Sequence, residues 1–265
     1  MTSIGILGVA GRMGQAILAE ILDRPGATFA GGCDAQAHPL AGQALRNAIT
    51  GEDLGLTIGT EAAEIFPVAD VVIDFSTPDA LDGHLVLAAA NETPVIIGTT
   101  GLTAQHHSLI DEVSQQVAIM QSANTSLGVT LLAKLVQDAA ALLDPSWDIE
   151  VLEMHHRGKA DAPSGTALLF GERAAEGRQI EKERFVLSRE GQTGPREEGD
   201  IGFATLRGGD VAGEHSVIFA ADAERIELTH KATDRKIFAR GAVTAAQWID
   251  GLPAGRYTME DVLGL

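Results

Sequence analysis

The segment Glu153-Met-His-His-Arg-Gly-Lys159 places two histidines, an arginine and a lysine within a short stretch of chain. Histidine exchanges protons near neutral pH, and lysine and arginine attract anions, so the cluster could serve as an acid–base site for an anionic substrate. Neighbouring side chains on a strand face opposite ways, so His155 and His156 can share one pocket only where the strand ends. Gly158 indicates such an end.

A second group of polar residues, Pro163-Ser-Gly-Thr166, comes directly before an apolar helical pattern. Hydroxyls and free N–H groups at a helix start can bind a carboxylate or phosphate, although Ser164 could also be a plain helix cap. A zinc site is the alternative use of the histidines. Zinc ligands usually lie farther apart and include a further Cys or His pair, so we expect no metal.

The amino-terminal segment Ile4-Gly-Ile-Leu-Gly-Val-Ala-Gly-Arg-Met-Gly14 reads as a strand, a glycine turn and a helix start. Gly8, Gly11 and Gly14 would permit the tight turn, the approach of a pyrophosphate and close helix packing. Asp34 follows Gly14 at the distance expected of a carboxylate that binds the ribose of NAD. The alternative, ordinary turn glycines, explains this combination less well.

The same region bears on the choice of nicotinamide cofactor. A carboxylate at Asp34 repels the 2′-phosphate of NADP, and the next residue is Ala35 rather than an arginine. We therefore expect NADH to be preferred, with NADPH possible because Arg12 could reach a phosphate. Cys33, next to Asp34, is expected to be a small core residue rather than a reactive thiol. Residues 1–126 contain no lysine and only three arginines: Arg12, Arg24 and Arg46.

Two further turns follow apolar runs in this half of the chain: Asp74-Phe-Ser-Thr-Pro78 and Gly98-Thr-Thr-Gly101. In parallel sheets ligands bind beyond the carboxyl ends of the strands, so these hydroxylated turns are candidates for contact with the nicotinamide and its ribose. Each could instead be only a helix cap.

The elements that would position these residues alternate in the first half of the chain. Short Val- and Ile-rich runs are typical of buried parallel strands, and apolar helical faces lie between them. The strands are expected at residues 4–9, 28–33, 71–75, 95–98 and 117–122, and helices include Met13 to Leu22 and Leu81 to Ala89. This pattern predicts an α/β fold with a Rossmann-like, doubly wound parallel sheet.

The second half has a different pattern. A long amphipathic helix at 127–143 is followed by a strand at 147–155, a helix at 164–175 and strand-like runs at 203–207, 215–221 and 225–230. Successive strands predict a smaller α+β domain with a mixed or antiparallel sheet. Residues 177–200 are expected to form a long loop, and a last helix near 235–250 to pack on the first domain. The expected domains are 1–126 with 236–265 for the dinucleotide, and 127–235 for substrate binding and oligomerisation.

The composition of the chain argues against several classes of protein. The chain has 265 residues, 45% of them hydrophobic, and a formal net charge of -18. Such an acidic chain without a basic stripe is not expected to bind nucleic acid. No apolar run is long enough to span a membrane, no secretory signal is visible, and a single cysteine excludes an intrachain disulfide. We expect a cytoplasmic protein.

The segments that carry these candidate sites resemble the 4-hydroxy-tetrahydrodipicolinate reductase family, also called dihydrodipicolinate reductase. The similarity runs from residue 5 to residue 232, and its most specific part is the pairing of His-His-x-x-Lys with Ser-Gly-Thr. The matching segments are Gly8–Gly14, Asp74–Pro78, Gly98–Gly101, Glu153–Lys159, Asp161–Thr166, Gly202–Arg207 with Gly209-Asp210, Gly213–His215, and Thr229–Ala232.

The resemblance implies NAD(P)H-dependent reduction of 4-hydroxy-tetrahydrodipicolinate, a cyclic dicarboxylate, with loss of water, in diaminopimelate and lysine biosynthesis. It implies that His155 is the general acid/base and Lys159 the proton donor. The implied substrate-binding residues are His156, Lys159, Ser164, Gly165 and Thr166. The implied cofactor-binding residues are Gly8, Val9, Ala10, Gly11, Arg12, Met13, Asp34, Gly98, Thr99, Thr100, Ser122, Ala123, Asn124 and Thr125.

The chain departs from the family pattern at three of its positions. Thr125 stands where members commonly carry an aromatic residue, Gly158 replaces a larger residue of some members, and Ala35 stands where some carry arginine. The family is typically a homotetramer, and the strands at 203–230 could extend a sheet across subunits.

Two other functions remain alternatives. One is a dehydrogenase of another small acid that shares the first domain, although the second half has no cysteine for thiol-based aldehyde chemistry. The other is a dinucleotide-sensing regulator, which would bind cofactor without turnover and would not need the His-His-x-x-Lys cluster.

Overall fold

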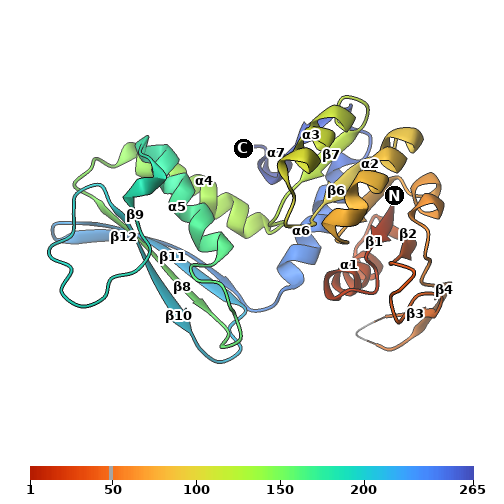
Figure 1. Cartoon of the computed structure of the whole chain (residues 1–265), viewed down its shortest axis with the longest axis horizontal. Helices are drawn as coiled ribbons and strands as arrows, with labels where there is room; N and C mark the ends of the chain where they lie inside the picture. Colours follow the sequence, from red (N-terminus) through yellow and green to blue (C-terminus); the bar gives the residue numbers. More distant parts are fainter. Residues whose placement is uncertain (48–49) are drawn as a thin grey trace. The chain divides into compact units, whose positions relative to one another are not determined.

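The computed structural model describes residues 1–47 and 50–265, which divide into two compact units. Unit 1 comprises Met1–Ser126 and Lys236–Leu265, and unit 2 comprises Leu127–Arg235. Figure 1 shows a helix-flanked sheet in unit 1 and a sheet with two long helices in unit 2. Within the described ranges, no helix combines the length and apolar character needed to cross a membrane.

Unit 1 contains a six-stranded parallel sheet in the order β13-β7-β6-β5-β1-β2. Strand β1 lies between β2 and β5, so the chain reverses its direction of progress across the sheet at this point, where such folds bind ligands. The elements of unit 1 are β1 (Thr2–Leu7), α1 (Arg12–Asp23), β2 (Ala27–Cys33), β3 (Ala44–Arg46), β4 (Asp53–Thr57), η1 (Ala62–Glu64), η2 (Phe66–Val68), β5 (Val71–Asp74), α2 (Pro78–Asn91), β6 (Val95–Ile97), α3 (Ala104–Val113), β7 (Ala118–Gln121), α6 (Lys236–Ile249), β13 (Gly255–Tyr257) and α7 (Met259–Leu263).

Helices cover the parallel sheet, which explains why its central strands read as continuous apolar runs. Helices α2 and α3 pack together over Val72 of β5 and Val95 and Ile97 of β6, which are all buried. Helices α1 and α6 pack on each other and also contact the sheet. The Rossmann-like fold predicted for this half is confirmed.

Unit 2 contains a five-stranded mixed sheet in the order β12-β11-β8-β10-β9. Strand β8 runs parallel to β10 and antiparallel to β11, so the predicted mixed sheet is confirmed. The elements are α4 (Leu127–Leu142), β8 (Asp148–His155), α5 (Gly165–Arg178), η3 (Lys182–Arg184), β9 (Phe185–Val186), β10 (Ile201–Arg207), β11 (Gly213–Ala221) and β12 (Glu224–Ala232).

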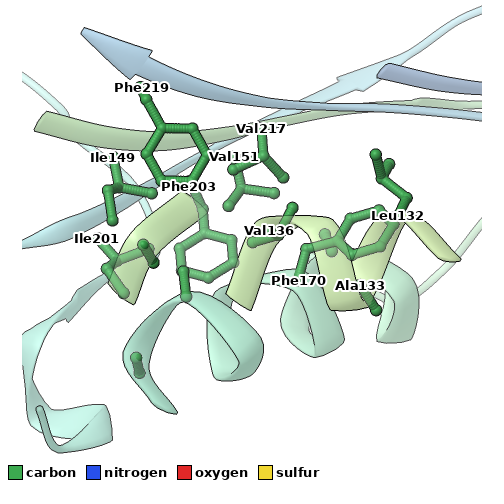
Figure 2. Packing of buried hydrophobic residues seen from close by; sticks show 14 of the residues in the cluster. Leu132, Ala133, Val136, Ile149, Val151, Phe170, Ile201, Phe203, Val217 and Phe219 are labelled. Carbon is green, nitrogen blue, oxygen red and sulfur yellow. The ribbon is translucent and has the colours of Figure 1, made fainter. Parts of the chain in front are cut away.

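The core of unit 2 lies where α4 and α5 cover one face of this sheet. Figure 2 shows Phe170 of α5 and Val136 of α4 beneath Val151, Phe203 and Val217 of the strands. Side chains on β8 are alternately buried and half-buried from Asp148 to His155. The odd-numbered positions of β8 therefore face the helices. This alternation determines which residues at the end of the strand point inward.

The predicted loop at 177–200 is only partly a loop. Helix α5 continues to Arg178, and the short strand β9 pairs with the start of β10. This pairing depends on a strand far along the chain, so local composition did not reveal it. Short elements that the sequence patterns did not predict are α3, β13, α7 and the β3–β4 hairpin.

Candidate active site

The glycine turn between β1 and α1 has a separate use for each glycine. Gly8 has a positive φ of 80°, and a Cβ on it would lie 2.7 Å from the carbonyl oxygen of Phe75. A Cβ on Gly14 would lie 2.1 Å from the carbonyl oxygen of Gly8, so only glycine lets α1 pack this close to the turn. Gly11 is the N-cap of α1. The turn thus presents bare backbone beside a helix N-terminus, which fits a dinucleotide diphosphate.

Asp34 holds the glycine turn against the end of β2. Its carboxylate accepts hydrogen bonds from the N–H groups of Ala10, at 3.1 Å, and Ala35, at 2.9 Å. Its side chain is half-buried, as a residue at the rim of a nucleotide site would be. Val9 is fully buried in the core, whereas Arg12 at the start of α1 is exposed and Met13 is half-buried.

A buried carboxylate, Asp74 at the end of β5, joins the next two turns. It is 0% exposed and accepts hydrogen bonds from the N–H and hydroxyl of Ser76, at 2.9 and 2.6 Å. The Thr99 hydroxyl lies 3.2 Å from it, and Nδ1 of His84 on α2 lies 2.8 Å from it. Sequence reasoning placed Asp74 in a ligand-binding turn without a role. The structure shows that it fixes that turn.

The other predicted cofactor residues lie beyond β6 and β7. Gly98 is needed because a Cβ there would lie 2.1 Å from the Phe75 ring, and Thr100 is exposed. After β7, the Ser122 hydroxyl donates to the Asn124 carbonyl at 2.7 Å, and Ala123 is exposed. Thr125 is 2% exposed and donates its hydroxyl to the carbonyl of Phe238 at 2.7 Å. Its side chain therefore braces the backbone of unit 1.

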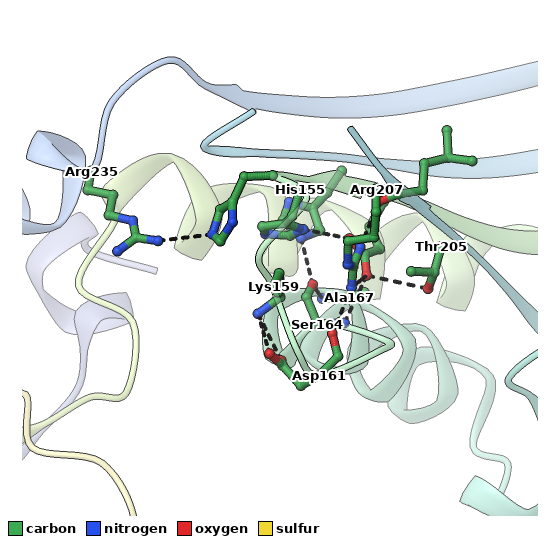
Figure 3. Close-up of polar contacts among 12 residues, drawn as sticks. His155, Lys159, Asp161, Ser164, Ala167, Thr205, Arg207 and Arg235 are labelled. Atoms are coloured by element: carbon green, nitrogen blue, oxygen red, sulfur yellow. Dashed lines mark hydrogen bonds and ion pairs between the residues drawn. The ribbon is translucent and has the colours of Figure 1, made fainter. Parts of the chain in front are cut away.

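The end of β8 holds His155 against a buried carboxylate. Nδ1 of His155 lies 2.5 Å from Oε2 of Glu153, two residues earlier on the same face of the strand. Arg207, the last residue of β10, binds both oxygens of Glu153 at 2.9 and 3.0 Å (Figure 3). Burial acts to raise the pKa of Glu153, but the hydrogen bonds from Arg207 and His155 outweigh it and hold that pKa below its usual value.

His156 and Lys159 follow the end of β8, as the position of Gly158 indicated. Nε2 of His156 lies 3.2 Å from the guanidinium of Arg235 (Figure 3). The Lys159 ammonium lies 2.8 Å from both oxygens of Asp161, whose side chain is 62% exposed. Such an exposed pair contributes about 0–1 kcal/mol, so a substrate carboxylate could replace Asp161 as the partner of Lys159 at little cost.

Ser164 caps helix α5, which is one of the two uses that the sequence allowed for it. It is 2% exposed, its hydroxyl accepts from the N–H of Ala167, and its own N–H donates to Glu153. The hydroxyl also lies 2.9 Å from Nε2 of His215. Gly165 is exposed at the first position of α5, so the helix start that could meet an anion lies at Gly165 and Thr166.

His215 on β11 is a site residue to which sequence reasoning gave no role. It is 4% exposed, and its ring meets that of His155 edge to face with 5.0 Å between centroids. Burial, and then the nearby His155, lower the pKa of His215 to about 4, so it is neutral at physiological pH. Glu153 and Arg207 were likewise given no role. The spacing of Glu153 two positions before His155 on a strand was the available signal.

A metal site and a reactive thiol are the other chemistries that histidines and a cysteine could supply. Among the side chains that the structure describes, no group of three or more His, Cys, Asp or Glu residues is placed to hold a metal ion. Cys33 is buried, and burial together with Asp34 raises the pKa of its thiol to about 12. It packs as a small core residue.

Comparison with known proteins identifies the family. The family model "Dihydrodipicolinate reductase, N-terminus" matches residues 2–125, and "Dihydrodipicolinate reductase, C-terminus" matches residues 128–263. The 4-hydroxy-tetrahydrodipicolinate reductase of Afipia carboxidovorans is 48% identical over 261 residues, covering 98% of this chain and 96% of the relative. That of Zymomonas mobilis is 48% identical over 263 residues, covering 99% and 97%.

A solved structure supports the fold. Dipicolinate-bound dihydrodipicolinate reductase from Paenisporosarcina sp. TG-14 superimposes with a TM-score of 0.76 at 22% identity, over 97% of each chain. Both family models and the near full-length relatives lead to one conclusion: the chain is a reductase that belongs to the dihydrodipicolinate reductase family.

Proposed function

We propose that this chain reduces 4-hydroxy-tetrahydrodipicolinate to tetrahydrodipicolinate with NADH, using His155 and Lys159 of unit 2 as its acid–base groups. The reaction is that of its family and belongs to diaminopimelate and lysine biosynthesis. The observation that carries the residue roles is the grouping at the end of β8. There His155 is buried and hydrogen-bonded to the Glu153 carboxylate, Lys159 pairs with an exposed carboxylate, and helix α5 begins.

The division of roles between the units follows from their chemistry. Unit 1 offers a side-chain-free glycine turn at a helix start, which suits a nicotinamide dinucleotide. When bound, that cofactor supplies the hydride. Unit 2 offers an ammonium group, an imidazole and a helix N-terminus for the two carboxylates of a cyclic substrate: Lys159, His156, and the N-terminal residues Gly165 and Thr166 of α5.

The reaction consumes one hydride and one proton and releases water. Hydride addition to the conjugated ring builds negative charge, which a positioned acid must neutralise. His155 is buried and hydrogen-bonded to Glu153, which fixes the orientation of its ring. Lys159, in contrast, pairs with the exposed carboxylate of Asp161. In this proposal Lys159 donates a proton from the substrate-bound position, and His155 acts as the general acid/base.

The test is NADH oxidation by the purified protein with enzymatically generated substrate. His155→Ala and Lys159→Ala should each lower kcat by about 100-fold or more while the Kd for NADH changes little. Lys182→Ala is the matched control, because Lys182 lies in the same unit and also pairs with an exposed carboxylate, that of Glu172. Wild-type turnover in both site variants would refute the assigned roles.

The preference for NADH rests on Asp34. Its carboxylate is bound only by backbone N–H groups among the contacts that the structure records, so its negative charge is not neutralised by a cation there. A 2′-phosphate beside it would be repelled. Asp34→Asn combined with Ala35→Arg should shift the ratio of kcat/KM values toward NADPH by about tenfold or more. Equal wild-type efficiency with both cofactors would contradict the preference.

We further propose a cytoplasmic homotetramer assembled through the sheet of unit 2. The face of that sheet that points away from α4 and α5 carries Leu152, Met154, Ala204, Leu206 and Ile218, and Leu206 is 48% exposed. Apolar patches of this kind favour association. Light scattering should give four times the 27.7 kDa chain mass, and Leu206→Glu should reduce it. A monomeric wild type would refute the tetramer.

A further inference from the structure

Glu153 is the most heavily bonded side chain of unit 2's candidate site. Its Oε1 accepts from the Ser164 N–H at 3.1 Å and lies 3.4 Å from the Thr205 hydroxyl. The Arg207 guanidinium binds both oxygens, and Oε2 also meets Nδ1 of His155. With 1% of its side chain exposed, Glu153 has little freedom to turn or to exchange partners with water.

These contacts determine the charge state of Glu153. An arginine fork and a backbone N–H can only donate hydrogen bonds, so they stabilise the ionised carboxylate. The pKa of Glu153 lies below its usual value despite burial, because the hydrogen bonds from Arg207 and His155 outweigh the burial that would raise it. Glu153 is therefore an acceptor toward His155 throughout the physiological range of pH.

An ionised carboxylate cannot donate, so the hydrogen atom in the Glu153–His155 contact must lie on Nδ1 of His155. The neutral imidazole then has its acceptor at Nε2, and the protonated ring offers its second proton from Nε2. The space at Nε2 is kept open by a glycine. A Cβ on Gly213 would lie only 3.0 Å from that atom.

His215 completes this arrangement from the other side. Its ring meets His155 edge to face, and its Nε2 lies 2.9 Å from the Ser164 hydroxyl. A neutral His215 adds no positive charge beside His155, so the Glu153 carboxylate is the charge in direct contact with His155.

We propose that Glu153, held by Arg207, is the positioning residue that fixes the Nδ1–H tautomer of His155 and makes Nε2 the atom that exchanges the proton with substrate. The inference rests on the proposed function of His155 and adds to it the atom and the residue that selects it. Glu153 acts through His155 and need not touch the substrate.

The decisive experiment is NMR of the side-chain nitrogens of isotopically labelled histidine in the full-length protein, because it reports the tautomer directly and needs no activity. The wild type should show Nδ1–H for neutral His155. Glu153→Gln, whose amide can also donate, should raise the population of the Nε2–H tautomer. A wild-type His155 that is mainly Nε2–H would overturn the inference even if every variant failed to fold.

Steady-state kinetics provide a second test of the role of Glu153. Glu153→Gln should lower kcat by about 100-fold while the KM for NADH stays within about threefold, and Glu153→Asp should restore part of kcat. The matched control is Glu150→Gln. Glu150 lies on the same strand and is also bound by arginine, in its case by Arg189 and Arg196, and among the described contacts it has no histidine partner. It should keep the wild-type His155 tautomer and a kcat within about threefold of wild type.

The two hypotheses fail in different ways. If the wild type does not reduce 4-hydroxy-tetrahydrodipicolinate, the proposed function fails, but the tautomer measurement still tests the contact with Glu153. If the wild type is active and Glu153→Gln retains wild-type kcat with an unchanged tautomer, the proposed function stands and the positioning role of Glu153 is overturned.

Discussion

Acidification tests the electrostatics around His215, which is neutral because it is buried. Burial lowers the pKa of His215 to about 4 in the folded chain, against about 6.5 for an exposed histidine. Below about pH 6.5 the unfolded chain binds a proton that the folded chain does not, so acid favours unfolding. The stability that depends on neutral His215, measured as free energy of unfolding, is fully present above about pH 6.5. It is lost progressively as the pH falls toward 4.

The magnitude follows from the two pKa values. Between about pH 7.5 and about pH 5, the free energy of unfolding should fall by about 2 kcal/mol because of His215 alone, at about 1.4 kcal/mol for each pH unit below 6.5. The loss should level off below the folded pKa of about 4, where both states are protonated. The figure is of the order of a fifth of the stability of a typical domain, so it is measurable.

The assay is urea unfolding of the wild type and His215→Gln at both pH values and at one protein concentration, since an oligomer's stability depends on concentration. Glutamine places a nitrogen near the position of the imidazole Nε2 and does not titrate. Other titrating groups are common to both proteins and cancel in the difference. The wild type should lose about 2 kcal/mol more than the variant on acidification. Equal losses would refute the claim that His215 is buried in its neutral form.

Three further predictions concern unit 1. Gly14→Ala should lower the free energy of unfolding by about 1–3 kcal/mol and weaken NADH binding, because a Cβ there would collide with the Gly8 carbonyl. Its control is Gly83→Ala, in open space on α2, which should raise the free energy of unfolding by about 0.5–1 kcal/mol. Thermal unfolding measures both variants. Asp74→Ala should cost on the order of 3 kcal/mol, seen in urea unfolding, because it leaves several buried polar partners unsatisfied. Cys33 should react with a thiol reagent far more slowly in the folded than in the unfolded protein, since its thiol pKa is about 12.

The parallel sheet was predictable because its local signals agreed with one another. The central strands β1 and β5 are almost fully buried and therefore read as apolar runs. The turn after β1 needs glycine at Gly8 and Gly14, because a Cβ at either position would collide with backbone. The elements that escaped prediction depend on distant partners. Strand β9 exists through pairing with β10, and β13 through pairing with β7, so neither has a strong local pattern.

The candidate site was predictable as a list of residues but not as a set of contacts. Residue types and spacing singled out the cluster at 155–159, and the family resemblance implied the roles of His155 and Lys159. Neither could show that Glu153 bonds to His155 and Asp161 to Lys159. Ser164 shows the limit most clearly. Its position before a helix fits both a ligand site and a cap, and only the structure shows its hydroxyl accepting from Ala167.

In the proposed mechanism, the difference between the two carboxylate contacts suits His155 and Lys159 to different roles. Glu153 is 1% exposed at its side chain, and breaking a buried charged contact costs about 3–5 kcal/mol, so His155 keeps this partner with or without substrate. Asp161 is 62% exposed, and its contact with Lys159 is worth about 0–1 kcal/mol, so Lys159 can leave it for a substrate carboxylate. A residue that must keep its orientation through proton transfer needs the first kind of contact, and a residue that must bind and release an anion in each turnover needs the second. Under the proposed roles, the burial of Glu153 suits a His155 of fixed orientation, and the exposure of Asp161 suits a Lys159 that binds a substrate carboxylate and donates its proton from there.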